Sequence, residues 1–361
     1  MEKIKPIIGF SCGDLNGVGL EVVIKAVSNN QLLSICTPII FANNKCINFY
    51  KKGIIEGNFN FTIVKDLATL NTKQVNVYNC WEEDVAIQPG QMNTEIGKYA
   101  WISLKTATEA LKNGEIHALV TAPIHKKTIL SDEFHYTGHT PFLKEYFDCQ
   151  DVVMFMCAEN MRVAVVTEHI PIKEVANSLD KDIIVSKLKI IQESLRVDFG
   201  ITKPKIAVLG LNPHASDDGL IGNEEETIIK PAIKLARNKD ILAFGPYPAD
   251  GFFAHGHYNN FDAVLAMYHD QGMIPFKSLA IGEGVNYTAG MPVVRTSPDH
   301  GTAMDIAGKG IADSTSTLES IFLAVDIVRM RFQYEEDRAD PIKKMSERIL
   351  GNLADEKIVL D

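Results

Sequence analysis

The chain has 361 residues, of which 46% are hydrophobic and 23% are charged, so it can build one large or two smaller cores. This composition excludes an intrinsically disordered protein, which would contain far fewer apolar residues. The 46 acidic residues outnumber the 36 basic residues, and the net charge of −10 argues against nucleic-acid binding and against adhesion to anionic membranes.

Six cysteines are scattered without a CxxC pair, which is typical of reduced, mostly buried thiols rather than of a disulfide framework. The lysines at the N-terminus precede an apolar stretch that Asp14 ends early, and no small-residue cleavage site follows. This stretch therefore predicts a first β-strand rather than a signal peptide. No run approaches ~18 apolar residues, so no transmembrane helix is predicted and we expect a cytoplasmic protein.

The first third of the chain alternates short β-rich runs with one long amphipathic segment. Strands are predicted at Pro6–Ser11, Pro38–Ala42, Phe61–Val64, Val75–Tyr78 and Ala118–Thr121. A helix is predicted at Thr94–Asn113, because apolar side chains recur every three or four residues and Gly114 provides a stop.

The same alternation continues to the end of the chain. A hairpin is predicted from Val152–Met156 and Arg162–Thr167, which flank Glu159-Asn160. Further strands are predicted at Lys205–Gly210, Ile241–Phe244 and Ala263–Met267, and helices at Asp180–Phe199, Glu224–Ala236 and Ser316–Phe332. Pro231 leaves the start of the second of these helices open. The pattern predicts an α/β protein with a largely parallel sheet, in which two domains would exchange strands or share the sheet.

Three histidines follow strongly apolar strands: His169, His214 and His269. Because the carboxyl ends of parallel strands converge on the ligand site, three imidazoles delivered there suit Zn²⁺ or a similar ion and leave a fourth position for substrate. The alternative is that each histidine is a polar residue in a turn. His255 and His257 are closer in sequence, but the glycines and asparagines around them indicate a loop.

Two glycine-rich stretches invite a functional interpretation. Gly13–Gly19 fits neither GxGxxG nor GxxxxGK[ST], which leaves open a tight strand-to-helix turn and a backbone contact with a ligand. Asp299–Gly310 is too rich in small residues to be an ordinary helix. Its backbone can approach a flat ligand closely, so we expect a binding loop.

Cationic and amide side chains also gather late in the chain. Lys277, Asn286 and Arg295 lie beside glycine, proline or strand-like sequence rather than on a helix face. Such donors suit a phosphate or carboxylate, whereas simple solvation is the alternative for any single lysine. His139 and Thr140 add an imidazole and a hydroxyl at a glycine turn.

Together these segments resemble the 4-hydroxythreonine-4-phosphate dehydrogenase family over essentially the whole chain. The matching stretches are GDLNGVGLE from Gly13, VTAPIHK from Val120, GHTPFL from Gly138, LNPHASDDGLIGNEE from Leu211, GPYPAD from Gly245, YHDQGMIPFK from Tyr268 and VNYTAGMPVVRTSPDHGTAMDIAG from Val285. Leu15 and Leu20 depart from the family's usual prolines, and Tyr287-Thr288-Ala289 departs from its usual VT-leucine pattern.

The resemblance implies a fold like that of isocitrate and isopropylmalate dehydrogenases, with two α/β domains flanking an active-site cleft at a homodimer interface. One domain would comprise residues 1–133 plus 276–361 and carry the cofactor loop. The other would comprise residues 134–275 and carry the metal ligands and the dimer interface.

The resemblance also implies roles for particular residues. It assigns one divalent metal to His169, His214 and His269, with His269 coming from the partner subunit; zinc is favoured over cobalt or magnesium. It assigns substrate binding to His139, Thr140, Lys277, Asn286 and Arg295, and NAD or NADP binding to His300, Gly301, Thr302, Ala303 and Asp305. Asp250 and Asp270 lie in matching segments, where a carboxylate can orient a metal-bound histidine. The general base stays unassigned.

The implied reaction is oxidation of the C3 alcohol of 4-phosphooxy-L-threonine (4-hydroxythreonine 4-phosphate) by NAD⁺. The resulting β-keto acid loses CO₂ to give 3-amino-2-oxopropyl phosphate, a precursor in pyridoxine 5′-phosphate (vitamin B6) biosynthesis. The metal would act as a Lewis acid, and Lys277 and Arg295 would hold the phosphate. An alternative is a sister dehydrogenase acting on 4-phospho-threonate, 4-phospho-erythronate or a dihydrodiol carboxylate. A transferase or a non-catalytic phosphate-binding protein would need neither the histidine trio nor the His300 loop.

Overall fold

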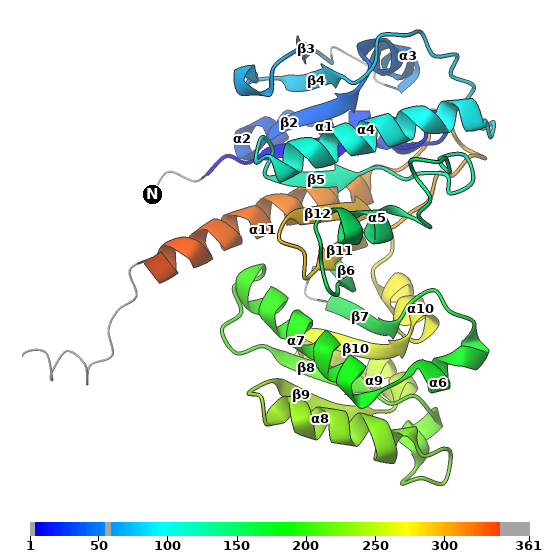
Figure 1. The fold of residues 1–361 in the computed structure, drawn as a ribbon, viewed down its shortest axis with the longest axis vertical. Helices are drawn as coiled ribbons and strands as arrows, with labels where there is room; N and C mark the ends of the chain where they lie inside the picture. The colour runs from blue at the N-terminus through cyan, green and yellow to red at the C-terminus, as the bar shows by residue number, and fades with distance from the viewer. Residues whose placement is uncertain (1–3, 55–58, 160, 340–361) are drawn as a thin grey trace, which may run out of the picture.

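The computed structural model describes residues 4–54, 59–159 and 161–339, and strands and helices alternate along most of them (Figure 1). The strands are β1 Ile7–Ser11, β2 Thr37–Ala42, β3 Phe61–Val64, β4 Val75–Asn79, β5 Ala118–Thr121, β6 Val153–Ala158, β7 Met161–Thr167, β8 Lys205–Leu209, β9 Leu242–Tyr247, β10 Ala263–Tyr268, β11 Val285–Ala289 and β12 Val294–Pro298. The helices are α1 Gly19–Val27, α2 Leu32–Ile35, α3 Asn44–Ile54, α4 Thr94–Lys112, α5 His139–Tyr146, α6 Val175–Ser178, α7 Lys181–Val197, α8 Lys230–Arg237, α9 Ala249–Ala254, α10 His269–Leu279 and α11 Thr315–Ala339.

The strands form one 12-stranded sheet in the order β3-β4-β2-β1-β5-β12-β11-β6-β7-β10-β8-β9. Six strands from β3 to β12 are parallel, and so are the four from β7 to β9. Between these groups, β12–β11, β11–β6 and β6–β7 pair antiparallel. Because these three neighbouring pairs are antiparallel, the two parallel groups run in opposite directions. The carboxyl ends of one group therefore lie beside the amino ends of the other.

This sheet confirms the predicted α/β class, the largely parallel sheet and the hairpin of β6 and β7. Because it is continuous from β3 to β9, the two halves of the molecule share one sheet, as the sequence suggested. The division at residues 133/134 and 275/276 stays a prediction.

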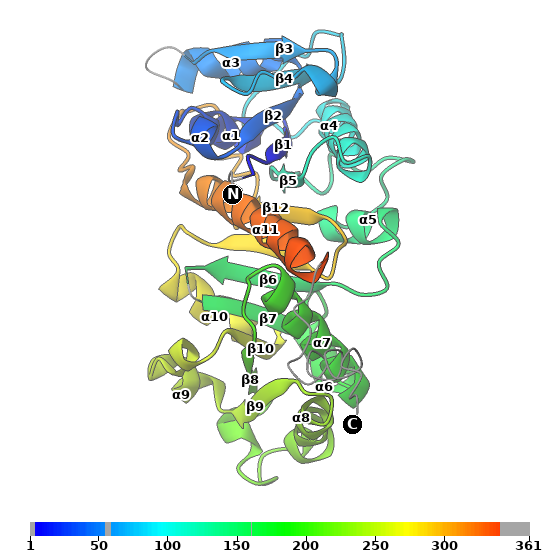
Figure 2. The same ribbon diagram turned by 90° about the vertical axis from the view of Figure 1, so that its left-hand side faces the viewer.

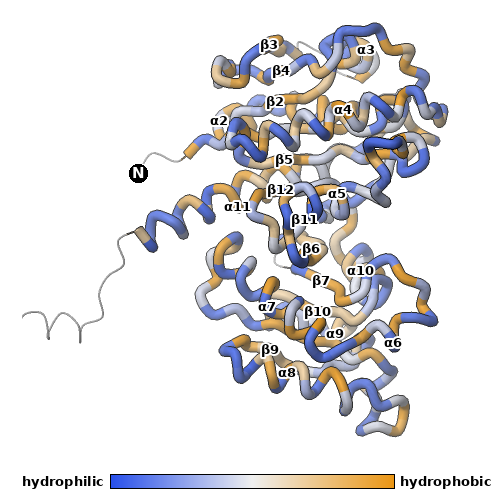
Figure 3. Tube along the Cα trace, viewed as in Figure 1, coloured by the Kyte–Doolittle hydropathy of each residue, from blue (hydrophilic) through white to orange (hydrophobic). Residues whose placement is uncertain are grey.

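Helices cover both faces of the sheet. Apolar side chains of α1, α7, α8 and α11 pack with one face, and those of α4, α5, α9 and α10 pack with the other. The sheet twists strongly over its length, so α1 and α8 lie on opposite sides of the molecule although they cover the same face (Figure 2). Blue and orange alternate along α7 and α8 in Figure 3, as expected for helices with one buried side.

Several elements differ from the sequence predictions. The predicted helix Glu224–Ala236 begins as a π-helical turn, Glu225–Ile229, before α8, because Pro231 has no N–H to continue a regular α-helical ladder. Helix α10 contains Pro275 and was not predicted. Lys277 lies on this helix, so the prediction that it lies off a helix face is wrong. Asn286 and Arg295 do lie in strands, β11 and β12.

A buried polar network joins α7, β11 and α11. The Tyr287 hydroxyl donates to Asp198 Oδ2 at 2.6 Å, and Arg331 Nε donates to Asp198 Oδ1 at 2.7 Å. Arg331 Nη2 also donates to the Tyr287 hydroxyl at 3.2 Å, and the Ser194 hydroxyl bonds to Asp198. Burial, followed by the charge of Asp198, raises the pKa of Tyr287, so the phenol stays protonated. The network fixes β11 against the helices on one face of the sheet.

Replacing Tyr287 with Phe should lower the free energy of unfolding by about 1–3 kcal/mol, because Asp198 and Arg331 each lose a buried partner. Urea denaturation measures this change. Tyr136→Phe is the control, since the Tyr136 hydroxyl bonds to Glu145 at an exposed position and its loss should have little effect. Equal stabilities for the two variants would contradict the role of the network.

Candidate functional site

A cluster of polar side chains lies on the sheet face covered by α5 and α10, and the cation Arg295 is its centre. Its side chain is only 3% exposed. Arg295 Nε and Nη2 donate to Thr121 Oγ1 at 3.0 and 2.7 Å, and Nη1 donates to Thr288 Oγ1 at 3.2 Å. Within the described residues no carboxylate pairs with this guanidinium, and burial lowers the pKa of Arg295 to about 10. A buried cation held only by hydroxyl groups suits an anionic ligand.

Two further polar atoms at this cluster lack partners. His139 is the first residue of α5, and its Nε2 is buried without a hydrogen bond. Asn286 Oδ1, from the neighbouring strand β11, is buried and unpartnered as well. Burial, and then the charge of Arg295, holds the pKa of His139 well below its ordinary value. Because buried polar groups normally have partners, these atoms fit a contact with a bound ligand.

The structure thus brings together His139, Asn286 and Arg295 of the five predicted substrate residues, with Thr140 next to His139 on α5. Lys277 is placed differently. It is about half exposed, and its Nζ forms an ion pair with Asp299 Oδ1 at 2.7 Å. Lys277 and Asp299 line a cavity of about 380 Å³ together with His300 and other residues of the predicted cofactor loop.

The predicted cofactor loop forms one wall of this 380 Å³ cavity. His300 and Ala303 line it, whereas Gly301, Thr302 and Asp305 lie in the same loop without lining it. His300 Nε2 is buried without a partner. The lining also includes the apolar side chain of Val22 on α1, which suits a ligand with a flat, uncharged part.

The glycine-rich turn after β1 supports the cofactor loop. The backbone N–H of Val18 donates to the carbonyl of Thr302 at 3.0 Å. A Cβ on Gly17 would lie 2.9 Å from the same oxygen, and a Cβ on Gly13, where φ is +65°, would lie 2.4 Å from the carbonyl of Pro123. The tight-turn interpretation therefore accounts for both glycines. Within the stretch Gly13–Gly19, Val18 is the residue that lines the cavity of about 380 Å³.

The three predicted metal ligands follow neighbouring strands, since the sheet order is β7-β10-β8. The rings of His169 and His269 lie 5.8 Å apart within one chain. His214 lies in the turn Pro213–Ser216 with a φ of +57°. Within the described part of the chain, no three His, Cys, Asp or Glu side chains are close enough to hold one ion. The described structure thus brings His169 and His269 near each other but does not bring His214 to the same point.

One of the two predicted carboxylates contacts a predicted metal ligand. Asp270 Oδ1 lies 2.8 Å from His269 Nδ1, which leaves Nε2 free to face a metal. Asp250 and Asp270 line a cavity of about 600 Å³ together with His214. In the structure Asp270 therefore orients His269, whereas Asp250 shares the cavity of His214.

Residues that the sequence did not single out hold the three strand ends together. Gln271 accepts a hydrogen bond from the N–H of Met267 at 2.7 Å and donates to the carbonyl of Gly210 at 2.6 Å. Thr167 Oγ1 donates to the carbonyl of Met267 at 2.9 Å. Fully buried Glu225 accepts from two backbone N–H groups just before His214, each at 2.7 Å. No local pattern identifies these residues, because their partners lie on other elements.

The surroundings of the histidines are unusually apolar for an exposed surface. Ile172, Leu220 and Ile274 are 71%, 80% and 63% exposed, and Ile170 and Ile221 are exposed as well. These five residues, here called the apolar rim, come from the segments that follow β7, β8 and β10. An exposed apolar surface around candidate ligands is typical of a protein–protein contact.

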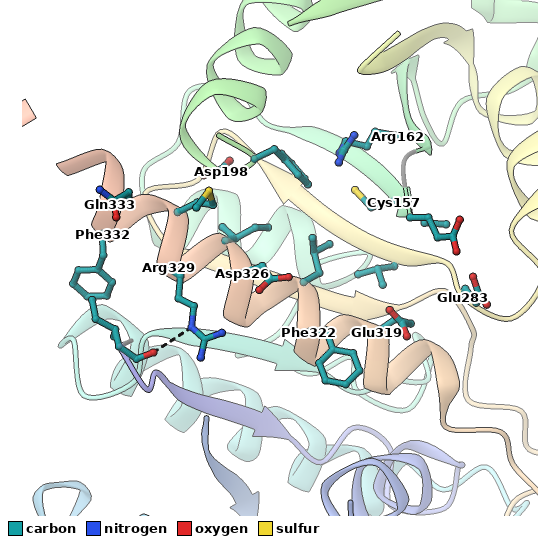
Figure 4. A pocket seen from close by; sticks show the side chains of 18 of the residues that line it. Cys157, Arg162, Asp198, Glu283, Glu319, Phe322, Asp326, Arg329, Phe332 and Gln333 are labelled. Carbon is teal, nitrogen blue, oxygen red and sulfur yellow. Dashed lines mark hydrogen bonds between the residues drawn. The ribbon is translucent and has the colours of Figure 1, made fainter. Parts of the chain in front are cut away.

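A larger cavity than these two lies on the opposite face of the sheet. It has a volume of about 800 Å³ and runs between α11 and the strands β6 and β7 (Figure 4). Glu159, Glu283 and Glu319 are among its lining residues, and burial together with the other two charges raises the pKa of Glu319. An acidic cavity without any predicted site residue does not suit a phosphorylated ligand, so size does not identify the site here.

Comparison with known proteins supports the sequence resemblance. Residues 34–324 match the family described as "Pyridoxal phosphate biosynthetic protein PdxA". A 4-hydroxythreonine-4-phosphate dehydrogenase of Bacteroides thetaiotaomicron is 46% identical over 345 residues, covering 95% of this chain and 94% of that protein. A putative D-threonate 4-phosphate dehydrogenase of Oceanobacillus iheyensis is 37% identical over 90% of this chain and 98% of its own.

A solved structure is similar over nearly the same range. The crystal structure of a 4-hydroxythreonine-4-phosphate dehydrogenase from Klebsiella pneumoniae is 32% identical and has a TM-score of 0.80, covering 91% of this chain and 100% of that chain. As the composition suggested, none of the helices in the described ranges is both long and apolar enough to span a membrane.

The surroundings of His139 predict how its imidazole titrates. Because the folded protein holds its pKa well below 6.5, the ring should stay neutral in the folded protein at pH 6 but not in the urea-unfolded chain. The unfolded chain then binds the extra proton, so the contribution of His139 to stability should fall as the pH drops below about 6.5. NMR of histidine-labelled protein, assigned with His139→Gln, measures both states. A folded-state midpoint near 6.5 would contradict the burial of this ring.

Proposed function

Because this chain belongs to the family of the pyridoxal phosphate biosynthetic protein PdxA, we propose that it is a dehydrogenase that oxidises 4-phosphooxy-L-threonine. The product is a β-keto acid that loses CO₂ to give 3-amino-2-oxopropyl phosphate. The observation that carries this proposal is the buried guanidinium of Arg295, which has no carboxylate partner in the described chain and lies beside the unpartnered His139. Such a cluster is suited to an anionic substrate.

The side chains of the cluster have distinct tasks in this proposal. Arg295 binds two oxygens of the phosphate, while the neutral imidazole of His139 and the hydroxyl of Thr140 add uncharged hydrogen bonds. Asn286 completes the binding site from β11. Lys277 reaches the phosphate by leaving Asp299, with which it is paired in this structure at 2.7 Å. Fixing the phosphate fixes the carbon that carries the hydride.

The cavity of about 380 Å³ beside His300 is the proposed site for the adenosine of NAD or NADP. When bound, this cofactor accepts the hydride. His300 and Ala303 contact it directly, and Gly301, Thr302 and Asp305 shape the loop. The unpartnered Nε2 of His300 supports this assignment, because a polar group of the cofactor can bind there.

His169, His214 and His269 are the proposed ligands of one divalent metal, for which three nitrogens favour zinc over cobalt or magnesium. When bound, the metal supplies Lewis-acid stabilisation of oxygen. The pairing of Asp270 with His269 Nδ1 supports a ligand role for the other ring nitrogen.

A homodimer with a shared active site is the proposed assembly. The apolar rim comes from the same segments as the three histidines and is exposed in the single chain, as expected for a surface that a second copy covers. The family resemblance implies that His269 is supplied by the partner. The separation of 5.8 Å between the His169 and His269 rings favours the alternative, in which both serve the same site in one chain.

A sister dehydrogenase is the second candidate, because the relative from Oceanobacillus iheyensis is named for D-threonate 4-phosphate. Both substrates carry the phosphate that Arg295 would bind, so the cluster of polar side chains does not separate them.

Formation of NADH or NADPH, followed by absorbance, tests the proposed function. The panel contains 4-phosphooxy-L-threonine, its unphosphorylated form, D-threonate 4-phosphate and erythronate 4-phosphate, each with a divalent metal. We expect the highest kcat/KM with 4-phosphooxy-L-threonine and at least a hundredfold loss without the phosphate, since the buried cation then lacks its partner. A higher kcat/KM with D-threonate 4-phosphate would select the sister activity.

Removing one proposed metal ligand should remove the metal. His214→Ala should lose stoichiometric zinc, measured by mass spectrometry, and at least 99% of turnover, while circular dichroism stays unchanged. His257→Ala is the control, because this exposed histidine lies in a turn after α9 outside the trio. If His214→Ala retains both zinc and activity, His214 is not a ligand.

Mixed dimers show which chain supplies His269. Homodimers of His169→Ala and of His269→Ala should both be inactive. If His269 acts in the partner's site, a mixed dimer collects both defects in one site and leaves the other intact, so activity should approach half that of wild type. If His169 and His269 serve the same site from one chain, both sites are damaged and activity stays absent. Two different affinity tags isolate the mixed dimers, so a negative result counts against His269 acting in the partner's site.

A further inference from the structure

We propose that Thr121 and Thr288 are positioning residues, which hold the guanidinium of Arg295 as a rigid receptor for two oxygens of the substrate phosphate. This inference rests on the proposed function and adds two residues to the binding site. It draws on the hydrogen bonds of Arg295, on the absence of a carboxylate partner in the described chain, and on the place of both threonines in the sheet.

The hydrogen bonds leave two N–H groups of the guanidinium without an acceptor. An arginine has five N–H groups, and three of them are used here. Thr121 Oγ1 accepts from Nε and Nη2, and Thr288 Oγ1 accepts from Nη1. One N–H remains on each terminal nitrogen, and the described residues supply no acceptor for either. Two donors on adjacent nitrogens match two oxygens of one phosphate.

The chemistry of the two threonines preserves the positive charge. A hydroxyl group orients the guanidinium without neutralising it, whereas a carboxylate in the same place would form an ion pair that the substrate would have to break. The neighbouring His139 is kept uncharged by its low pKa and therefore does not repel Arg295. The positive charge of Arg295 is therefore not neutralised before the phosphate binds.

The sheet fixes both hydroxyl groups. Thr121 is the last residue of β5 and Thr288 lies in β11, and these two strands flank β12, which carries Arg295. Thr121 is 0% exposed and Thr288 is 1% exposed. Backbone pairing on both sides therefore holds the hydroxyl groups in place before any ligand binds, which lowers the entropic cost of binding.

The same strand offers a matched control. Thr296 follows Arg295 and is also 0% exposed, but its Oγ1 donates to the carbonyl of Ser320 on α11 at 2.9 Å, on the opposite face of the sheet. Thr296→Val removes a buried hydroxyl next to Arg295 in sequence without touching the guanidinium. It separates a loss of stability from a loss of positioning.

The test compares Thr121→Val, Thr121→Ser, Thr288→Val and Thr296→Val in the full-length enzyme. Steady-state kinetics give KM and kcat for 4-phosphooxy-L-threonine, calorimetry gives the Kd of inorganic phosphate, and thermal melting reports folding. Thr121→Val should raise both KM and Kd about tenfold or more and change kcat by less than about threefold, because the hydroxyl acts on binding. Thr288→Val should raise both about threefold or more. Thr121→Ser should restore wild-type values within about threefold, and Thr296→Val should lower the melting temperature only.

Several outcomes would overturn the proposal. An unchanged KM and Kd in Thr121→Val would do so, and so would a Thr121→Ser variant as defective as Thr121→Val, since the hydroxyl would then not matter. If Thr121→Val does not fold, Thr288→Val decides by the same criterion. If the wild type oxidises no substrate in the panel but binds phosphate, the proposed function fails. The Kd of inorganic phosphate for the threonine variants then still tests the role of Thr121 and Thr288.

Discussion

Burying a guanidinium without a carboxylate carries a large desolvation cost, and the site is arranged around this one charge. Arg295 is surrounded by hydroxyl groups from β5 and β11, and the adjacent His139 is kept neutral. The larger cavity on the opposite face is lined with Glu283 and Glu319 and would repel the anions that Arg295 attracts. The sign of the buried charge, rather than the volume of a cavity, is the basis on which we assign substrate binding to this face.

The reversal of strand direction in the middle of the sheet explains how the site is divided. The histidines follow strands of one group, and the predicted cofactor loop follows β12 of the other group. Because the two groups run in opposite directions, these parts begin at opposite ends of the strands. Helix α10 connects them. It begins with His269 and carries Lys277 in its last turns, roughly 12 Å further along the axis at 1.5 Å per residue. The proposed substrate site lies on the face between these two ends.

The sequence predicted most elements well where one periodicity dominated, as in α4, α7 and the apolar strands. It did not predict β11 and β12, because Asn286, Thr288 and Arg295 interrupt their apolar pattern, nor α10, because of Pro275. These elements carry much of the candidate site. The family resemblance supplied the site residues, but not Thr121 or its partners, since contacts across the sheet depend on strands far apart in sequence.

The order of strands also bears on the synthesis of the chain. Strand β5 is complete at Thr121, but its neighbour β12 begins only at Val294, whose backbone pairs beside Ala118. At 5–20 residues per second a ribosome needs roughly 10–35 s to make the intervening chain. Throughout this interval a fully buried strand of the finished protein has an unpaired edge, the kind of edge that promotes aggregation. Until the C-terminal third of the chain emerges, β12 is not there to cover this edge of β5.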